Sequence, residues 1–312
     1  MTRFGSAAFT DPDNYPSSLM DADICLVATS RAEFDVQVSW LHMRRLRLVS
    51  IEEKAPRVAL FALPSSRLFI SFPLADDPPL IWNGIRLKRG DLVLHAPGER
   101  FHQRTTGATR WGLISASPND LKGYVRTLLD AELSTNSTQL FRPSTQSSDA
   151  LLRLHSQADR LARTKPRLLA QPEVGRSFEQ ELIHALVTGL GTAETARRSV
   201  WHRRANVMLR FEEALATHDR PQPLPALCAE IGVPERTLRA YCASFLDCSP
   251  IEYARLRRLN LAHSTLLLSD CNVTSVAEIA RVHGFSEPGR FAVTYRALFG
   301  ETPLATLHRR PR

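Results

Sequence analysis

The stretch Ala229-Glu230-Ile231-Gly232-Val233 is repeated in pattern as Arg281-Val282-His283-Gly284-Phe285. Behind each stretch, apolar residues recur at intervals of four: Leu238, Cys242 and Leu246 in the first copy, and Phe291, Tyr295 and Phe299 in the second. Each of these positions in the second copy lies 53 residues after its partner in the first. The chain therefore contains an internal repeat.

Each copy predicts a short helix, a tight turn and a second helix. Residues at i, i+4 and i+8 share one face of a helix, so each second helix presents one apolar face. Gly232 and Gly284 lie where the chain must turn sharply, and glycine adopts a left-handed backbone at little steric cost. Pro225 suits the first turn of a helix, and Ser275 with Glu278 has the spacing of a capping box. This is the pattern of a helix-turn-helix unit, present twice.

Between the copies, residues 251–268 contain neither glycine nor proline and predict a connecting helix about 27 Å long. The whole order of residues resembles the DNA-binding domain of AraC/XylS-type transcription regulators. The residues that carry the resemblance are Gly232-Val233, Arg236-Thr237-Leu238, Ser249-Pro250, Tyr253, Arg257-Arg258-Leu259, Val276-Ala277-Glu278-Ile279-Ala280, Gly284-Phe285, Phe291, Phe299-Gly300 and Thr302-Pro303. In that family, two helix-turn-helix units on a shared helix place recognition helices in successive major grooves.

The resemblance implies a sequence-specific DNA-binding transcription regulator, an activator, with double-stranded DNA and RNA polymerase as its partners. Three residues depart from the family's pattern. Asp247 stands where glycine is usual, Cys242 where an aromatic residue is usual, and Pro234 where a capping Ser or Thr is common. All three lie in the first unit and weaken it more than the second, although we expect both units to fold.

The first turn of the second helix in each unit holds the residues expected to meet DNA. In the first unit, Arg236 and Arg239 can each pair with the edge of a guanine. Glu235 can accept a hydrogen bond from cytosine, or it can complement the positive end of its own helix. In the second unit, Arg290 is the long donor. The residues expected to contact or closely approach the DNA backbone are Thr237, Pro288 and Gly289.

Positive charge is concentrated on the part of the chain that bears the repeat. The net charge is +8, and the chain from Arg197 onward holds 17 Arg, no Lys and 11 acidic residues, which places +6 there. Contact with phosphates requires such a distribution, although charged surfaces are often simply solvated. The basic residues 192–204 are interpreted as a hinge with solvated arginines, Arg197 and Arg198 among them.

Residues 20–118 predict an all-β region that forms a compact barrel or sandwich. Turn signals are present at Trp82-Asn83-Gly84-Ile85 and Arg89-Gly90-Asp91. The runs rich in β-forming residues are 36–49, 58–62, 67–72 and 92–96. With the helical C-terminal part, the predicted fold class is α+β.

This β region resembles, more loosely, the cupin-like β-barrel that serves as sensor domain in the same regulators. The resemblance lies in Ile81-Trp82-Asn83-Gly84 and Gly90-Asp91-Leu92-Val93-Leu94, followed by Pro97-Gly98. It implies a small-molecule effector whose identity and contact residues these positions do not reveal. His95 and His102 lack the close spacing of a metal-binding pair, so we interpret them as structural and expect neither a metal nor another cofactor.

After Pro118 the pattern becomes helical, with helices expected at residues 121–133, 150–161 and 173–190 and a polar loop at 134–148. The apolar stripe Phe178, Leu182, Ala185 and Leu186 fits either a core or a homodimer interface. We divide the chain into a cupin-like sensor domain at 1–133, a helical connector and hinge at 134–204, and a DNA-binding domain at 205–312, with helix-turn-helix units at about 224–247 and 275–300.

Two other classes of protein remain as alternatives. One is a cupin-type enzyme, or a DNA-repair protein that uses a cysteine, fused to a helix-turn-helix module. The five cysteines do not have the spacing of metal ligands. The sequence also shows no catalytic residues that would form a pair of nucleophile and base, and no phosphate-binding loop. The other is an interaction protein whose helix-turn-helix units have lost DNA binding. The observation in its favour is that Ala240 and Val293 have short side chains where a long hydrogen-bond donor could reach a base.

No apolar run approaches the length of a membrane span, and the first residues lack the core of a signal peptide. We therefore expect a cytoplasmic protein that has no membrane partner and is not an enzyme.

Overall fold

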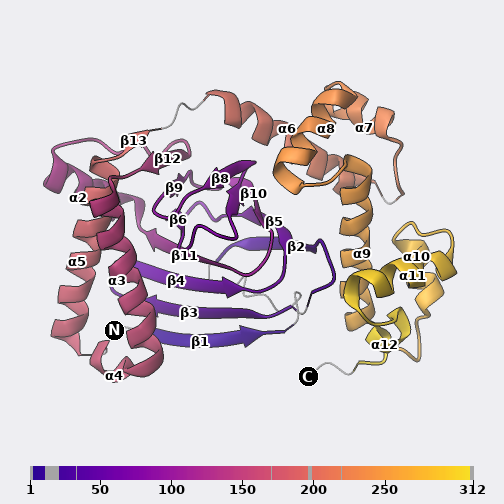
Figure 1. The fold of residues 1–312 in the computed structure, drawn as a ribbon, viewed down its shortest axis with the longest axis horizontal. Helices are drawn as coiled ribbons and strands as arrows, with labels where there is room; N and C mark the ends of the chain where they lie inside the picture. Colours follow the sequence, from indigo (N-terminus) through magenta and orange to yellow (C-terminus); the bar gives the residue numbers. More distant parts are fainter. Residues whose placement is uncertain are drawn as a thin grey trace.

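The described strands form two β-sheets, and Figure 1 shows one group of helices on one side of the strands and the C-terminal helices on the other. The computed structural model describes residues 3–10, 21–32, 34–169, 171–195, 199–218 and 220–309. The α+β class predicted from the sequence is confirmed. Among these described residues, no helix is long and apolar enough to cross a lipid bilayer.

Both sheets are antiparallel. The described strands of the larger sheet lie in the order β1 (Arg3–Phe9), β3 (Val36–His42), β4 (Leu46–Glu53), β11 (Thr109–Ala116), β6 (Leu68–Pro73), β9 (Leu92–His95), β12 (Gln139–Arg142) and β13 (Glu194–Thr195). Those of the smaller sheet lie in the order β2 (Asp23–Ala28), β5 (Arg57–Ala62), β10 (Arg100–Thr105), β7 (Leu80–Trp82) and β8 (Ile85–Leu87).

The helices fall into two groups on either side of the sheets. The layer against the larger sheet contains α2 (Pro118–Leu129), α3 (Thr145–Thr164), α4 (Pro166–Leu169) and α5 (Pro172–Gly191). The C-terminal group contains α6 (Ser199–Thr217), α7 (Leu224–Ile231), α8 (Glu235–Leu246), α9 (Pro250–Leu268), α10 (Val276–Val282), α11 (Pro288–Phe299) and α12 (Pro303–Leu307).

The two sheets face each other across an aromatic core. The rings of Phe61 and Phe101 stack at 5.0 Å, and the edge of Trp111 meets Phe61 at 5.9 Å. The described strands form two separate sheets and do not close into one ring. Of the two architectures considered from the sequence, the sandwich therefore describes this region, and the barrel is not confirmed.

Side-chain alternation along β10 makes the smaller sheet two-faced. Phe101 and Gln103 point into the space between the sheets, where Gln103 accepts a hydrogen bond from buried Arg57. Arg100, His102 and Arg104 point the other way and contact the C-terminal helices. The sheet thus carries its neighbouring helical domain on its outer face.

The outer face of the larger sheet is covered by α2, α3 and α5. Its leucine and isoleucine side chains share one core with helix residues that include Leu151, Leu182 and Leu186. Leu182 and Leu186 are fully buried in this core. The apolar stripe on α5 is therefore part of the intramolecular core and is not a free interface.

The predicted hairpin at residues 82–85 is confirmed, because β7 and β8 pair across it. Asn83 and Gly84 both have positive φ angles, 45° and 75°, as a tight two-residue turn requires. Other sequence predictions were wrong. The expected loop at 134–148 contains β12 and the start of α3, and β1 was not predicted at all. The run 36–49, in which β structure was expected, contains β3 and the first part of β4.

His95 and His102 lie on different sides of the smaller sheet. His95 is buried between the sheets, where Nε2 hydrogen bonds to Ser71 Oγ at 2.8 Å and Nδ1 to Glu99 Oε2 at 2.7 Å. His102 faces outward and contacts Glu212 of α6. The two rings therefore do not share a site.

The buried His155 predicts a pH dependence of stability. It lies between α3 and the larger sheet, its Nε2 bonds to the Val49 carbonyl at 3.2 Å, and burial lowers its pKa from 6.5 to about 4. The unfolded chain binds a proton on this imidazole more readily than the folded protein does. The fold therefore loses stability as the pH falls below the pKa of the imidazole in the unfolded chain. The free energy of unfolding should therefore decrease by about 3 kcal/mol between pH 6.5 and 4 on account of this group.

We expect His155→Gln to remove this part of the acid destabilisation in urea unfolding at pH 7 and pH 4.5. His184→Gln on α5 is the control, because His184 is exposed. Equal loss of stability with pH in wild type and His155→Gln would contradict the prediction.

Candidate nucleic-acid interface

The first helix-turn-helix unit consists of α7 and α8. Gly232 ends α7 with a φ angle of 72°, and the amides of Gly232 and Val233 both donate to the Cys228 carbonyl, at 2.9 and 3.1 Å. The predicted apolar face of α8 is buried, with Leu238, Cys242 and Leu246 each at most 1% exposed. The first unit therefore folds as the sequence predicted.

The second unit, α10 and α11, has the same construction. Gly284 has a φ angle of 75°, and the amide of Phe285 donates to the Ala280 carbonyl at 2.8 Å. Ser275 Oγ accepts from the amide of Glu278 at 3.2 Å, which confirms the N-cap predicted for α10. Phe291 and Tyr295 are buried below α11.

The departures at Asp247 and Cys242 have structural explanations. Asp247 ends α8 with a φ angle of 63°, and its repeat partner Gly300 ends α11 with a φ angle of 79°. The Asp247 carboxylate accepts a hydrogen bond from Arg104 of β10 at 2.8 Å, which no glycine could do. Cys242 is fully buried, and burial raises the pKa of its thiol, so it serves as a core residue.

Helix α9 connects the two units and belongs to both cores. Tyr253 lies in its first half and Leu266 in its last turns, and both are buried in the core that α8 and α11 share. His263 Nδ1 hydrogen bonds to the Tyr295 hydroxyl at 2.5 Å, and that hydroxyl donates to Thr306 at 2.8 Å. These bonds fix α11 and α12 against the second half of α9.

The first turn of α8 is exposed, but its two arginines differ in their partners. Arg239 forms an ion pair with Glu235, with Nη2 2.6 Å from the carboxylate. Arg236 is exposed and has no acidic partner among the described residues. Arg236 is therefore free to reach a base edge, whereas Arg239 must first leave Glu235. Thr237 beside them is half-buried.

The first turn of α11 is also open to solvent. Arg290 is 82% exposed and lies 3.9 Å from Glu287, a loose contact. Pro288 and Gly289 are exposed, and a side chain at Gly289 would meet no atom within 4 Å. The structure thus leaves space at this helix start for an approaching DNA backbone.

A groove beside Arg290 contains residues that the sequence analysis did not assign to DNA contact. It has a volume of about 310 Å³ and includes Arg255 and Arg258 of α9. Arg258 is committed to the fold, because it donates to the Gly284 carbonyl and lies over the Phe285 ring. Arg255 is exposed. The run of arginines in the connecting helix was the signal that could have identified it.

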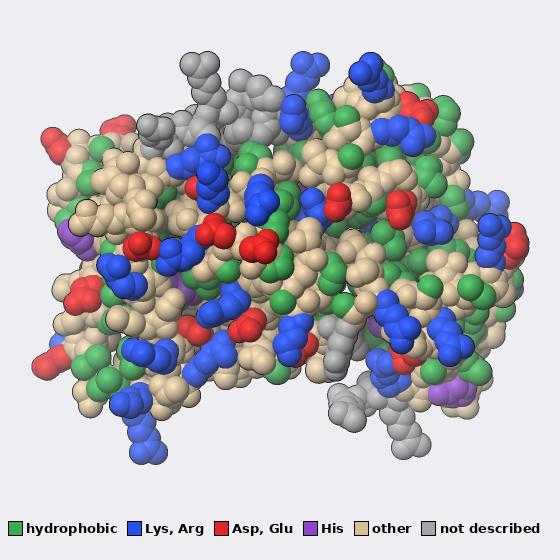
Figure 2. Space-filling model, viewed as in Figure 1, with side chains coloured by type: hydrophobic (Ala, Val, Ile, Leu, Met, Phe, Trp, Pro, Cys, Tyr) green, Lys and Arg blue, Asp and Glu red, His purple; other side chains and the backbone are tan. Residues whose placement is uncertain are grey.

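Arginine side chains are spread over the C-terminal helices on the face shown in Figure 2. Arg197 and Arg198, which the sequence analysis assigned to a solvated hinge, lie outside the described residues. Helix α6 begins at Ser199, within the stretch interpreted as that hinge.

The C-terminal helices dock on the smaller sheet through a buried carboxylate. Glu212 of α6 accepts from His102 of β10 at 2.9 Å and from the Tyr253 hydroxyl of α9 at 2.5 Å, with Arg257 Nε 3.3 Å away. Burial acts to raise the pKa of Glu212, but these partners hold it below its usual value. The carboxylate is therefore ionised at neutral pH.

Two further contacts join the C-terminal helices to the smaller sheet, in addition to those of Arg100 and Arg104. The side-chain amide of Asn260 in α9 accepts from the amide of Ala28 at 2.9 Å and donates to the Ala28 carbonyl at 3.2 Å. It thereby occupies the edge of β2 as a neighbouring strand would. Gly84 in the β7–β8 turn lies under Phe245 near the end of α8.

Comparison with known proteins identifies the C-terminal segment. The family described as "Helix-turn-helix domain" matches residues 227–309. "XylDLEGF operon transcriptional activator 1" of Pseudomonas putida is 45% identical over 75 residues, which are 24% of this chain and 23% of that relative. "Probable thc operon regulatory protein" of Rhodococcus erythropolis is 30% identical over 105 residues, which are 34% of this chain and 32% of the relative. The chain thus matches about a quarter to a third of these relatives' lengths.

Two solved structures also align with parts of this chain. The AraC-like transcriptional activator CuxR aligns with 84% of this chain and 96% of its own at 14% identity and a TM-score of 0.43. A probable AraC family regulator from Rhodopseudomonas palustris aligns with 34% of this chain and 98% of its own at 34% identity and a TM-score of 0.31.

Replacing Gly84 tests the docking of α8 on the sheet. A Cβ at Gly84 would lie 2.8 Å from Phe245, whereas one at Gly98 would meet nothing within 4 Å. Both glycines have positive φ angles, 75° and 71°. Gly98→Ala should cost about 1 kcal/mol through backbone strain alone. Gly84→Ala should cost about 1 to 3 kcal/mol more because Phe245 must move.

The measurement is chemical denaturation of both variants under identical conditions. Equal destabilisation by the two substitutions would mean that the contact between Gly84 and Phe245 contributes nothing to stability.

Proposed function

From residues 227–309, which belong to the helix-turn-helix domain family, we propose that the whole chain is a sequence-specific DNA-binding transcription regulator of AraC/XylS type. Within it, Arg236 is the main base-reading residue. The observation that carries this assignment is the exposure of Arg236 in the first turn of α8 without an acidic partner among the described residues. An arginine in that position can make a bidentate pair with guanine in the major groove.

The other assigned residues have supporting roles in this proposal. Arg239 and Arg290 reach bases after leaving Glu235 and Glu287, and Glu235 either accepts from cytosine or holds Arg239 in place. Thr237, Pro288 and Gly289 approach the sugar-phosphate backbone. Arg255 on α9 meets a phosphate between the two grooves.

The proposal includes regulation by a small-molecule effector through the N-terminal sheets. What supports it is their direct attachment to the DNA-binding helices through Glu212, Asp247 and Asn260. A change in the sheets is transmitted to α8 and α9 by these contacts. The domain division at 1–133, 134–204 and 205–312 belongs to the same proposal.

We further propose an activator that contacts RNA polymerase, acts in the cytoplasm and has no enzymatic step of its own. These features come from the likeness of the C-terminal segment to transcriptional activators. A homodimer remains part of the proposal, through a surface other than the stripe on α5, since that stripe is buried.

The full chain should bind a duplex taken from upstream of its own gene with steep salt dependence. Each neutralised phosphate releases counterions, so about six contacts would reduce the affinity by orders of magnitude between about 50 and 200 mM salt. Fluorescence anisotropy at several salt concentrations measures the slope. A folded chain without salt-sensitive binding to any duplex would contradict the proposed function.

Arg236→Ala should relax sequence preference, whereas Arg281→Ala should not. Losing a bidentate base contact costs about 1 to 3 kcal/mol at one base pair. Arg281 is exposed on α10, outside the recognition helices, so its loss should weaken cognate and scrambled duplexes equally. Binding curves for both variants on both duplexes give the comparison. An equal loss on both duplexes for Arg236→Ala would identify Arg236 as a backbone contact.

A further inference from the structure

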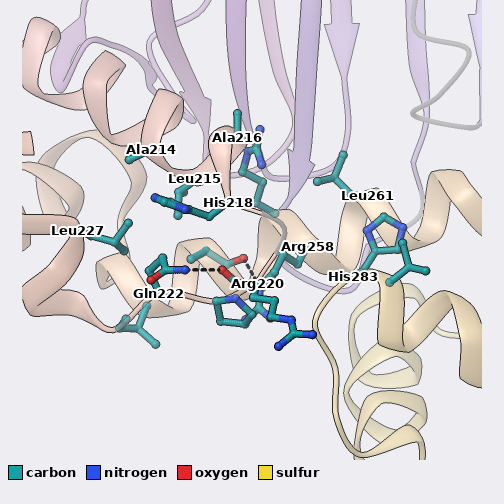
Figure 3. A pocket seen from close by; sticks show the side chains of 15 residues that line it. Ala214, Leu215, Ala216, His218, Arg220, Gln222, Leu227, Arg258, Leu261 and His283 are labelled. Carbon is teal, nitrogen blue, oxygen red and sulfur yellow. Dashed lines mark hydrogen bonds between the residues drawn. The ribbon is translucent and has the colours of Figure 1, made fainter. Parts of the chain in front are cut away.

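A cleft of about 430 Å³ lies between the two helix-turn-helix units. Its walls come from the end of α6, the loop at residues 220–222, α7, α9 and the end of α10. Figure 3 shows Leu215 and Leu227 on one side, Leu261 and His283 on the other, and Arg220 between them. The volume lies within the range of about 300 to 1,000 Å³ typical of small-molecule sites.

The cleft gathers exposed apolar side chains. Nine large apolar residues are exposed among those that the structure describes, and three of them, Ile251, Leu261 and Val282, line this cleft. Leu227 and Ala254 extend the apolar surface inward. Apolar surface concentrated in a concavity marks a place where a ligand can be desolvated.

The charges in the cleft are all of one sign. Its lining contains Arg220, Arg257 and Arg258 and no acidic residue. Arg258 donates a hydrogen bond to the Gly284 carbonyl and lies over the Phe285 ring. Arg257 forms an ion pair with Glu212. Arg220 is exposed and has no acidic partner among the described residues. One cation therefore remains available, beside an apolar wall.

Neighbouring groups do not add a second available charge. His218 lines the cleft, but its Nε2 lies 2.9 Å from the carboxylate of Glu230, a residue outside the lining, and is therefore already paired. Burial lowers the pKa of His283, and its Nε2 bonds to Thr265 Oγ1 at 2.8 Å, so its ring is neutral at pH 7. The complementary ligand thus has one anionic group on an apolar body.

We propose that this cleft is a binding site for an apolar small-molecule monocarboxylate. Its body packs on Leu227, Ile251 and Leu261, and its carboxylate pairs with Arg220. Because the walls come from both units, the bound molecule contacts the first unit at Leu227 and the second at Val282. The site is separate from the N-terminal sheets, and its occupancy does not depend on the proposed function.

Calorimetry on the full chain without DNA tests the site, with octanoate, octanol and octylammonium as probes. Octanoate should bind with one-to-one stoichiometry, octanol about ten-fold more weakly, and octylammonium not at all, because an ionic hydrogen bond contributes about 1.5 to 3 kcal/mol. Arg220→Gln should weaken octanoate about ten-fold. Ala254→Trp should fill the cleft and abolish binding.

Arg153→Gln on α3 is the matched control, because Arg153 is exposed and far from the cleft lining, and it should bind octanoate as wild type does. Thermal unfolding verifies that each variant is folded. If Ala254→Trp does not fold, the test is decided by Arg220→Gln, which changes a side chain in an exposed loop. The proposal is overturned by equal binding of the three probes, by wild-type affinity in Arg220→Gln, or by no saturation below the critical micelle concentration. DNA binding is measured separately, so its failure would not affect this result.

Discussion

The position of the C-terminal helices depends on one buried carboxylate, that of Glu212. Removing a carboxylate from water costs several kcal/mol, and only good partners offset that cost. Glu212 has three partners, His102, Tyr253 and Arg257, which come from β10 and α9. If the sheets separated from the helices, the Glu212 carboxylate would lose the hydrogen bond from His102. The docked arrangement is therefore favoured over a loosely tethered one.

Helix α9 transmits this constraint to both helix-turn-helix units. Its first half is held by Glu212 through Tyr253, and its middle is held on β2 through Asn260. Its second half holds α11 through His263 and Tyr295. The separation between α8 and α11 is thus determined by packing on one helix. The same docking explains why Asp247 is present at the end of α8. Its positive φ angle is unfavourable, but its carboxylate forms an ion pair with Arg104 of the sheet.

Sequence reasoning succeeded where the determining interactions are local. The spacing of four along α8 and α11, the glycines at 232 and 284 and the turn at Asn83-Gly84 act within a few residues, and each appears in the structure as predicted. It failed where strand formation depends on a distant partner. β1 exists by pairing with β3, and β12 by pairing with β9, although neither sequence is strongly typical of a strand. The two-sheet arrangement in place of a barrel is likewise a matter of long-range pairing.

The sequence by itself determined the repeat, the two helix-turn-helix units, the arginine bias of the C-terminal part and the set of candidate DNA contacts. Tertiary structure decided that the first turns of α8 and α11 stay exposed, so that Arg236 and Arg290 are open to solvent. It also decided that His102 meets Glu212, 110 residues away, and that residues of α6, α7, α9 and α10 enclose one cleft. The physical reason is that helix periodicity and turn conformation are properties of neighbouring residues. Buried charge pairs and cavities arise only when distant surfaces are packed together.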